Sequence, residues 1–431
     1  MSAALSNLEY LKYIEPHLAL KIIEFLLKQN STEEVKSLYK NLCIQTRNFE
    51  KIQSEKFMSE SEMNDLKSKN ESEMKELEEK LKGFLSLSEN CEKQKTHDLN
   101  VFSLGKKIIE QTSPIEILQY SMRLFDTKNF EKACIILNSF SIFHENNPKT
   151  KSKSIYALYL LYSIKVFIGE NIEQIEENFL RITKNIDKLK NLLDSLFKKV
   201  DFDAVDKVQV DFKEILLYRG YLLHWALFMI KYNSALFLDV LFEDKYFSLI
   251  ESSFTYLLKY LIVFSVINGS RKYITKLKDT ILKKRNFIGK HKDCFIVLLE
   301  NILVNFNYKD AMNNLAECKN LMKNDYFLYE YIEQFDKKLK EFILENILIL
   351  NECINIDDTK FLFNENEEET KKNLIAYIEY FYPNAKIKEE NKKISYEVDD
   401  DEINNYYKIK TEDLYSLTKN MVEFFKENKN N

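Results

Sequence analysis

Histidine and cysteine are the residue types in this sequence whose spacing tests most directly for metal and nucleophile chemistry. The five histidines, His17, His97, His144, His224 and His291, lie far apart. Zinc hydrolases place two histidines one residue or one helix turn apart, because both rings must reach the same ion. No such pair is present. The sequence therefore predicts neither a metal site of this type nor a cofactor.

The cysteines show no metal or redox spacing either. They are Cys43, Cys91, Cys134, Cys294, Cys318 and Cys353. No two form a Cys-x-x-Cys pair, and scattered thiols of this kind are typical of a reducing, cytoplasmic setting in which most are buried and free. There is also no Gly-x-Ser-x-Gly nucleophile motif. A Cys–His dyad assembled in space stays open, but nothing favours one, so we expect that the chain is not an enzyme.

Glycine and proline are scarce. The 431 residues include six glycines and four prolines, where average composition would give roughly 30 and 20. The two nearest glycines, Gly269 and Gly289, are too far apart for a phosphate-binding loop. Sandwiches, barrels and propellers need many more glycine and proline turns. The composition therefore argues against nucleotide-binding enzymes and favours an all-α chain.

Charge and hydropathy argue against two further classes of protein. The chain has 63 Lys and Arg residues against 68 Asp and Glu residues, a net charge of −5, whereas proteins that coat nucleic acid are basic. The most apolar stretches, 215–230 and 254–268, are shorter than the roughly 20 residues of a membrane-spanning helix. The first residues lack the basic start and apolar run of a signal peptide. We expect no membrane span.

One segment, 271–292, is nevertheless strongly basic. Its densest part carries Lys283, Lys284, Arg285, Lys290 and Lys292. Such a patch can bind RNA phosphates or an acidic neighbouring protein. The alternative interpretation is a solvated helix face whose lysine stems cover the core.

The apolar run around His224 and Trp225, the only tryptophan, has two interpretations. The pair can be a recognition site for a partner. We favour a buried pair of rings whose N–H groups donate to backbone carbonyls.

Helical spacing dominates the elements that position these residues. Apolar residues recur at intervals of three and four in 1–48, with Pro16 splitting or opening a helix. Segment 49–100 is polar, with an apolar stripe that has Asn70 on its seam, which predicts a solvated helix packed along one face or a weak coiled coil. We expect 86–100 to be a linker.

A series of helices is predicted from 101 to 353. Two parts of it repeat one pattern, in which an aromatic residue is followed by alanine three positions on and leucine seven positions on. The first begins at Phe130 and the second at Tyr308. Small and aromatic residues spaced in this way are typical of tetratricopeptide-like helix pairs, which stack into a solenoid.

The pattern of apolar and polar residues changes after residue 353. Segment 354–400 predicts two short helices, the second with an acidic start, and then a hairpin formed by 385–388 and 393–398. This order is the outline of a winged helix. A tail, 401–431, closes the chain with a helix over 411–426. The predicted fold class is all-α: a helical-repeat solenoid, a winged-helix module and a C-terminal helix.

Two apolar stripes in this last part are candidate subunit contacts. Because the second short helix starts with glutamates, which repel phosphate, we expect the winged helix to serve protein assembly. Its hairpin edge, with Ile394, Tyr396 and Val398 on one face, would add to a neighbour's strand; alternatively it covers its own core. The tail stripe consists of Leu414, Leu417, Met421 and Phe424. It would join a helix bundle, or pack on its own domain.

The order of parts and several strings resemble a known family. Helical repeats, a winged helix and a tail helix are the layout of PCI-domain scaffold subunits. Within this group the sequence resembles the scaffold subunits of eukaryotic translation initiation factor 3, and in particular the family of its e subunit, while Glu15-Pro16 departs from that family. The strings that carry the resemblance are His17-Leu18 with 22–26, 222–228, 256–261, 304–308, 324–328 and 353–356.

The resemblance implies a non-catalytic scaffold within the PCI core of that factor. Its partners would be the other PCI-type and MPN-type subunits and the small (40S) ribosomal subunit. In that setting the basic patch has ribosomal RNA or an acidic neighbouring subunit as its candidate partners, with the solvated face as the alternative. The factor supports recruitment of initiator tRNA and mRNA. Two alternatives stay open: a PCI subunit of the proteasome lid or signalosome, and a free-standing helical-repeat adaptor that binds peptides.

Overall fold

The chain forms helices over most of its described length, together with one small sheet. The computed structural model describes residues 9–29, 31–94, 108–145, 147, 150–197, 205–283, 293–351, 353–363, 367–382, 385–390 and 393–397. The predicted all-α class is confirmed, with a three-stranded sheet as the addition. The chain divides into two compact units: the first contains Met1–Leu261 with Leu321–Glu330, and the second contains Ile262–Asn320 with Tyr331–Asn431.

The first unit contains most of the helices. In chain order they are η1 (Glu9–Tyr13), α2 (Pro16–Gln29), α3 (Glu33–Gln45), α4 (Phe49–Ser54), α5 (Glu60–Gln94), α7 (Pro114–Asp126), α8 (Phe130–His144), α9 (Lys151–Ile168), α10 (Ile172–Phe197), α11 (Val205–Met229), α12 (Ser234–Leu241), α13 (Asp244–Ser253) and η3 (Thr255–Leu257). Helix α14 (Leu258–Ile267) leads from the first unit into the second.

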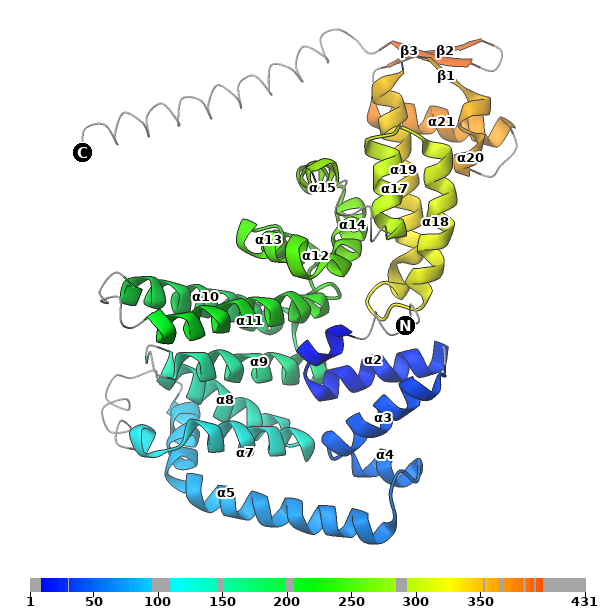
Figure 1. Ribbon diagram of the computed structural model, residues 1–431. Helices are drawn as coiled ribbons and strands as arrows, with labels where there is room; N and C mark the ends of the chain where they lie inside the picture. Colours follow the sequence, from blue (N-terminus) through cyan, green and yellow to red (C-terminus); the bar gives the residue numbers. More distant parts are fainter. Residues whose placement is uncertain are drawn as a thin grey trace, which may run out of the picture. The chain divides into compact units, whose positions relative to one another are not determined.

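Consecutive helices of the first unit stack on one another. Helix α7 packs on α8, α8 on α9, α9 on α10 and α10 on α11, which gives the layered arrangement seen in Figure 1. Nearest-neighbour stacking of this kind is how a solenoid buries its core. The predicted repeat pattern fits here, because Ala133 and Leu137 of α8 are both buried. A small residue at such a position lets neighbouring helices approach closely.

The first helices begin where the sequence predicts. Pro16 is the first residue of α2, a position where its missing N–H breaks no helical hydrogen bond. The Glu15 carboxylate accepts from the backbone N–H groups of His17 (2.8 Å) and Leu18 (3.3 Å), and it therefore caps the helix. At α3, Thr32 accepts in the same way from the Val35 N–H.

Helix α5 is longer than the sequence indicates. The expected linker at 86–100 is wrong for residues 86–94, because α5 continues without a break to Gln94. Within this part Leu87 and Ser88 are buried, and the Ser88 hydroxyl donates to the Phe84 carbonyl at 3.0 Å. The Ser- and Glu-rich composition suggested a loop, but burial of one face keeps the segment helical.

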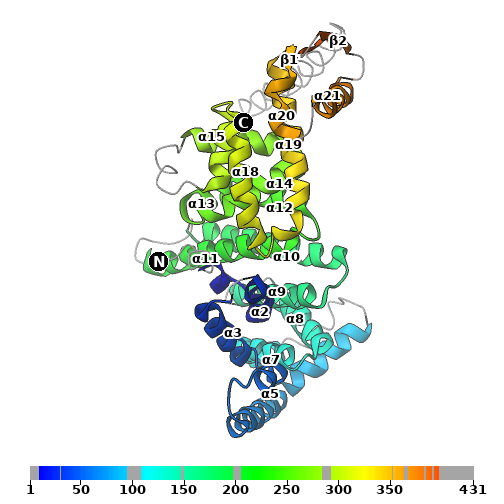
Figure 2. The same cartoon turned by 90° about the vertical axis from the view of Figure 1, so that its right-hand side faces the viewer.

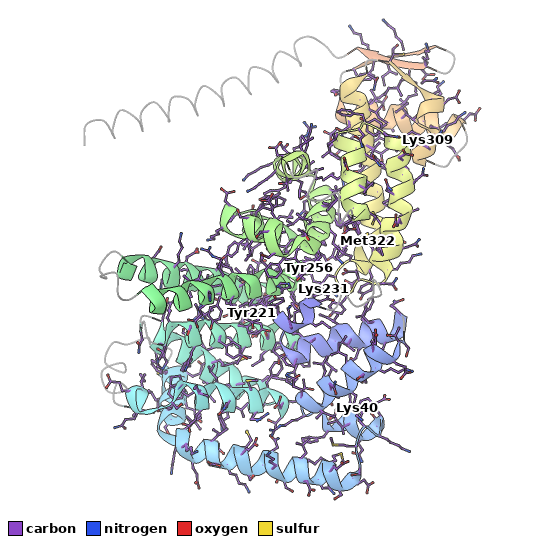
Figure 3. The ribbon with its side chains drawn as sticks, viewed as in Figure 1. Lys40, Tyr221, Lys231, Tyr256, Lys309 and Met322 are labelled. Atoms are coloured by element: carbon purple, nitrogen blue, oxygen red, sulfur yellow. The ribbon has the colours of Figure 1, made fainter. Side chains whose placement is uncertain are left out.

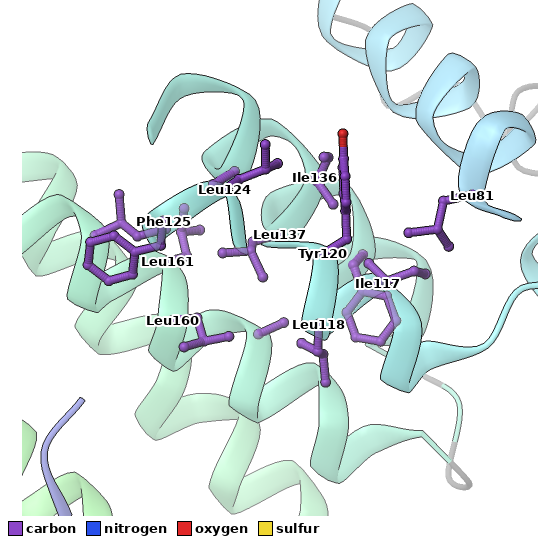
Figure 4. Close-up of a cluster of buried hydrophobic side chains, with 14 of the residues drawn as sticks. Leu81, Ile117, Leu118, Tyr120, Leu124, Phe125, Ile136, Leu137, Leu160 and Leu161 are labelled. Carbon is purple, nitrogen blue, oxygen red and sulfur yellow. The ribbon is translucent and has the colours of Figure 1, made fainter. Parts of the chain in front are cut away.

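The stripe of α5 packs inside the chain. Leu81 and Phe84 join a core with residues of α7, α8 and α9, shown in Figure 4. Tyr120, Leu137 and Leu160 are among its fully buried members. This contact supports the interpretation of the polar stretch now seen as α5 as a helix packed along one narrow face.

The second unit combines helices with the sheet. Its elements are α15 (Arg271–Lys283), α17 (Cys294–Leu303), most of α18 (Tyr308–Lys323), α19 (Ile332–Leu350), β1 (Cys353–Asn355), η5 (Ile356–Asp358), α20 (Lys360–Phe363), α21 (Glu367–Phe381), β2 (Lys386–Glu390) and β3 (Lys393–Glu397). The last residues of α18 and most of η4 (Tyr329–Tyr331) belong to the first unit. Helices α18 and α19 lie side by side in Figure 2, and Figure 1 shows α17 next to them. The rings of Phe295 in α17 and Phe335 in α19 contact each other, with their centroids 6.4 Å apart.

The sheet has the strand order β1-β3-β2, and both pairings are antiparallel. The hairpin of β2 and β3 confirms the period-two pattern of the sequence. Strand β1 was not predicted: its three residues are too few to show a period, and it pairs Ile354 with Ile394 far along the chain. Helices α20 and α21 connect β1 to the hairpin.

Candidate assembly surfaces

The hairpin residues predicted to contact a neighbour lie in the protein's own core. Ile394 is 0% exposed and Tyr396 is 7% exposed. The Tyr396 hydroxyl lies within hydrogen-bonding distance of the backbone carbonyls of Leu348 and Asn351, the latter at 2.9 Å. The tyrosine therefore fastens the sheet to the end of α19. Val398 lies outside the described residues.

The position of β3 corrects the expected docking edge. Strand β3 is central, because β1 pairs with one side and β2 with the other. An added strand needs unpaired N–H and C=O groups, so in the described part of the sheet only β1 and β2 offer an outer edge. Lys386, Lys388 and Glu389 of β2 are exposed. Any strand addition must therefore use β2 or the shorter β1.

Helix α21 supplies a second surface on this module. Leu374 and Ile378 face its core and are fully buried, whereas Tyr380 is 76% exposed. Lys371 forms an ion pair with Glu389, which joins α21 to β2. Glu368 and Glu369 at its start are exposed. An acidic helix start repels phosphate, which favours a protein partner over nucleic acid for this surface.

Part of the basic segment forms α15. Ile274, Leu277 and Ile281 make its buried face, while Arg271 and Lys272 are exposed, and Arg271 pairs with Glu345 of α19. The densest part of the predicted patch is not described: Lys284, Arg285, Lys290 and Lys292 lie outside the described residues, as does the side chain of Lys283 at the end of α15. The tail residues Leu414, Leu417, Met421 and Phe424 also lie outside them.

His224 and Trp225 form a buried aromatic joint that holds η1 against α11. Trp225 is stacked on Tyr159 with centroids 3.7 Å apart, and its Nε1–H donates to the Tyr13 carbonyl at 2.9 Å. The ring of Tyr13 stacks on His224 at 4.3 Å. Tyr221 of the same helix, labelled in Figure 3, contacts both Tyr13 and Trp225. The predicted buried pair is confirmed, and no pattern in the sequence signals that Tyr13 is its partner.

The contacts of the His224 ring define its protonation state. Nδ1 lies 2.6 Å from the Gly220 carbonyl, which only accepts, so Nδ1 carries the proton. Nε2 lies 2.5 Å from the Tyr256 hydroxyl and accepts its hydrogen bond. Burial lowers the pKa of His224 to about 4. The ring is therefore neutral, and its role is to hold neighbouring elements.

A second joint is made of polar, ionisable side chains. His17 Nδ1 lies 2.8 Å from Glu15 Oε1, and its Nε2 lies 3.4 Å from Asp126 Oδ1 at the end of α7. Burial is the main cause that raises the pKa of Asp126 to about 6, against the opposing effects of His17 and Arg123. The ring of His17 also stacks on Phe125 at 4.0 Å. These contacts fix α2 against α7.

The ion pairs continue from α7 to α5. Arg123 Nη1 lies 3.1 Å from Asp126 Oδ2, and Arg123 Nη2 lies 3.5 Å from Glu73 of α5. Glu73 also pairs with Arg47 at 2.9 Å. Arg47 in turn donates to Asn70, the polar residue on the α5 stripe. Asn70 therefore ties α5 to the turn after α3.

Within the ranges described above, no group of three or more His, Cys, Asp and Glu residues is placed to hold a metal ion. His97 and His291 lie outside those ranges. Among the same residues no single helix is long and apolar enough to cross a bilayer, although α13 and the following Thr255–Ile267, bent by 113°, reach the length together.

Comparisons with known proteins point to one family. No protein-family model matches the chain. Curated relatives from several eukaryotes match it, and each is named as the E subunit of eukaryotic translation initiation factor 3. The protein of Yarrowia lipolytica is 23% identical over 201 residues, which cover 44% of this chain and 48% of that protein. The protein of Dictyostelium discoideum is 26% identical over 185 residues, or 41% of this chain and 35% of that protein.

A longer match is found with the protein of Drosophila grimshawi, which is 22% identical over 307 residues, covering 67% of this chain and 70% of that protein. The first two matches span about half the length of the relatives or less. The resemblance seen in the sequence is thus confirmed: the chain is similar to the E subunits of eukaryotic translation initiation factor 3.

Proposed function

We propose that this chain is a non-catalytic scaffold subunit of eukaryotic translation initiation factor 3 that works in the cytoplasm. The similarity to the factor's E subunits from several eukaryotes is the observation that carries the proposal. Its partners would be other subunits of the factor, of PCI and MPN type, and the small ribosomal subunit. Through them it would support recruitment of initiator tRNA and mRNA.

The described structure supports a scaffold role in two ways. Stacked helices with long-range fixed joints, such as that between Tyr13 and Trp225, make a framework that keeps its shape. The module of β1, α20, α21, β2 and β3 has the order of elements of a winged helix, and we interpret it as the assembly end of a PCI domain. In the described part of the sheet β2 is the longer of the two outer strands, and the exposed Tyr380 lies on α21.

Affinity purification from native extract tests the proposal. The full chain carries a tag, the extract is kept at low salt, and the co-purifying proteins are identified by mass spectrometry. We expect stoichiometric recovery of other initiation factor 3 subunits together with proteins of the small ribosomal subunit. Recovery of proteasome-lid or signalosome subunits would keep the PCI interpretation and refute the function.

A free-standing peptide-binding adaptor is the second candidate. A groove of about 790 Å³ lies on the first unit, between α8, α9 and α10, with Asn138, Lys165 and Arg181 among its lining residues. Grooves of this kind are where helical repeats bind extended peptides. An adaptor would purify as a monomer without ribosomal proteins, so the same purification separates the two candidates.

A further inference from the structure

A small pocket of the first unit combines an apolar lining with two lysines. It has a volume of about 270 Å³ and lies between α2, the end of α9, the end of α11 and the segment Leu321–Glu330. Its apolar and aromatic lining comes from Leu18, Val166, Phe167, Phe228, Tyr232 and Tyr326. Lys21 and Lys231 also line it; Lys231 is just beyond the end of α11 (Figure 3).

The turn between α9 and α10 shapes one wall. Gly169 ends α9 with a φ of 72°, in the left-handed region that side-chain-bearing residues rarely adopt. This turn leaves the carbonyl of Phe167 within 2.7 Å of Lys21 Nζ. The same ammonium lies 4.1 Å from the centroid of the Phe167 ring. Lys21 is therefore fixed at the wall by a carbonyl and a ring.

Lys21 has no acidic partner. In the described part of the chain no carboxylate lies within ion-pair distance of its Nζ, and the side chain is half-buried. An ammonium has three N–H donors, and the Phe167 carbonyl accepts from one of them. Burial lowers the pKa of Lys21, and the nearby charge of Lys231 lowers it further. The pocket thus holds a cation that lacks its counter-charge.

Lys231 is only partly compensated. Its Nζ lies 3.1 Å from Glu330, a carboxylate that is itself 44% exposed. It also lies 5.2 Å from the Tyr326 ring and 5.8 Å from the Tyr329 ring. Two ammonium groups and one solvated carboxylate leave a net positive charge at the pocket. The ligand that this charge favours is an anion.

The lining decides which kind of anion fits. Phosphate sites are usually built from free backbone N–H groups, but here the N–H groups of Gly169 and Glu170 both donate to the Lys165 carbonyl. The remaining donors are ammonium and tyrosine hydroxyl groups on an apolar wall. Such a site suits a carboxylate carried on a short apolar stem. Its volume is just below the range of roughly 300–1,000 Å³ of small-molecule sites, and one or two side chains fill it.

The geometry points to a docking site for an acidic peptide segment of a partner protein, with one Asp or Glu side chain between Lys21 and Lys231 and an adjacent apolar side chain against Phe228 and Tyr326. This inference does not depend on the proposed function. It requires only that the pocket is open in the full chain.

Peptide display on the purified full chain tests the inference. Random twelve-residue peptides are selected on the wild type and counter-selected on Lys21→Met, which keeps the apolar stem and removes the charge. We expect the enriched peptides to share an acidic residue next to an apolar one. In fluorescence anisotropy, a synthetic enriched peptide should bind Lys21→Met and Lys231→Met about tenfold more weakly or worse, since each variant removes a hydrogen bond to a charged group.

Three controls keep the test decisive. Lys40→Met removes an exposed lysine of α3 and should leave peptide binding unchanged. Lys21→Arg keeps the positive charge and should bind the peptide nearly as well as the wild type does. Replacing the peptide's carboxylate with the amide should weaken binding as much as Lys21→Met does. Circular dichroism confirms that each variant folds.

Several outcomes overturn the inference. No enrichment, enriched peptides without an acidic residue, or equal binding by Lys21→Met would each refute it. Inorganic phosphate is the competing probe: if it displaces the peptide at an ionic strength where chloride does not, and loses this effect in Lys21→Met, the pocket is a phosphate site instead.

Discussion

The indole of Trp225 joins two distant parts of the chain with one hydrogen bond and one stacked ring. Its Nε1–H satisfies the carbonyl of Tyr13, and its face covers Tyr159. Trp225 itself is 1% exposed, whereas Tyr13 is half-buried. Much of the contribution of Trp225 to stability therefore comes from the hydrogen bond that the Tyr13 carbonyl would lose if the indole were removed.

Replacing Trp225 with phenylalanine tests this view. We expect the free energy of unfolding to fall by about 1–3 kcal/mol, because the half-buried Tyr13 carbonyl loses its indole donor and the aromatic joint loses part of its packing. Urea unfolding followed by far-UV circular dichroism measures the change. The exposed Tyr380→Phe is the control and should have almost no effect. Equal stability of Trp225→Phe and the wild type would contradict the role given to the indole.

Asp126 makes the stability of the joint between α2 and α7 depend on pH. Its pKa is about 6 in the folded chain, above the ordinary value of 3.8. Protonation therefore favours the folded state: the contribution is fully present below about pH 4 and is lost as the pH rises through 6. Asp126→Asn removes this dependence.

The expected result is a stability difference that changes with pH. Between pH 4 and pH 7 the variant should gain stability relative to the wild type by about 2 kcal/mol. Chemical unfolding at a series of pH values gives the difference directly, and subtraction cancels the titration of groups shared by both proteins. A difference that is constant over this range would show that Asp126 does not titrate there.

At the scale of elements, β2 is the edge on which assembly through the sheet would depend. In the β2–β3 ladder Glu390 lies opposite Lys393, and Lys388 lies opposite Ser395. Alternate residues of an antiparallel strand exchange backbone hydrogen bonds with the partner, and the spacing of Glu390 and Lys393 in the sequence predicts that these two pairs are the hydrogen-bonded ones. We therefore expect Ile387 and Glu389 to direct their backbone N–H groups outward, toward a strand of a neighbour.

Glu389→Pro is the corresponding prediction. Proline removes one outward N–H group from the edge and should reduce recovery of neighbouring subunits in the affinity purification severalfold, while leaving the β2–β3 ladder intact. Glu389→Ala is the matched control, since it also loses the ion pair with Lys371 but keeps the N–H. If both variants lose the neighbouring subunits, the Glu389 side chain and not its backbone N–H group is responsible for the contact.

Helices and strands could be predicted from the sequence wherever the spacing of apolar residues repeated over enough positions to be recognised. Pro16 marked the start of α2, and alternation marked the hairpin of β2 and β3. Strand β1 was missed because its partner is supplied by a part of the chain about forty residues away. Residues 86–94 were misassigned because their polar composition hides the buried face of α5.

The same limit applies to the candidate sites. The burial of Trp225 followed from its apolar surroundings, but Tyr13 as its acceptor did not, since the two are 212 residues apart. Ile394 and Tyr396 share a face, as expected. Whether that face is buried or exposed depends on its contacts with β1 and α19, and no local sequence pattern reveals these contacts.

At the scale of the whole molecule, the basic segment 271–292 predicts that association with ribosomes weakens as the salt concentration rises. The triple variant Lys283→Glu, Lys284→Glu and Arg285→Glu should weaken co-sedimentation with ribosomes at low salt by about tenfold or more, and the difference should shrink as salt rises. Sucrose gradients at several ionic strengths measure both effects.

A triple variant of equal net charge serves as the control. Lys40, Lys69 and Lys82 are exposed in the first unit, and their change to Glu should leave co-sedimentation largely unaffected. If both triple variants lose the association equally, total charge is responsible and the segment has no special role. If neither loses it, the segment is a solvated helix face.

The joint between Tyr13 and Trp225 also has a consequence for synthesis. Ribosomes add about 5–20 residues per second, so the segment Glu9–Tyr13 waits about 10 to 40 s before Trp225 has been made. Throughout that interval the Tyr13 carbonyl lacks its indole donor, and the Tyr13 ring lacks its contacts with Tyr221 and His224. The contacts between η1 and α11 therefore cannot form until α11 has been translated. A nascent chain halted before α11 would present this aromatic segment to chaperones.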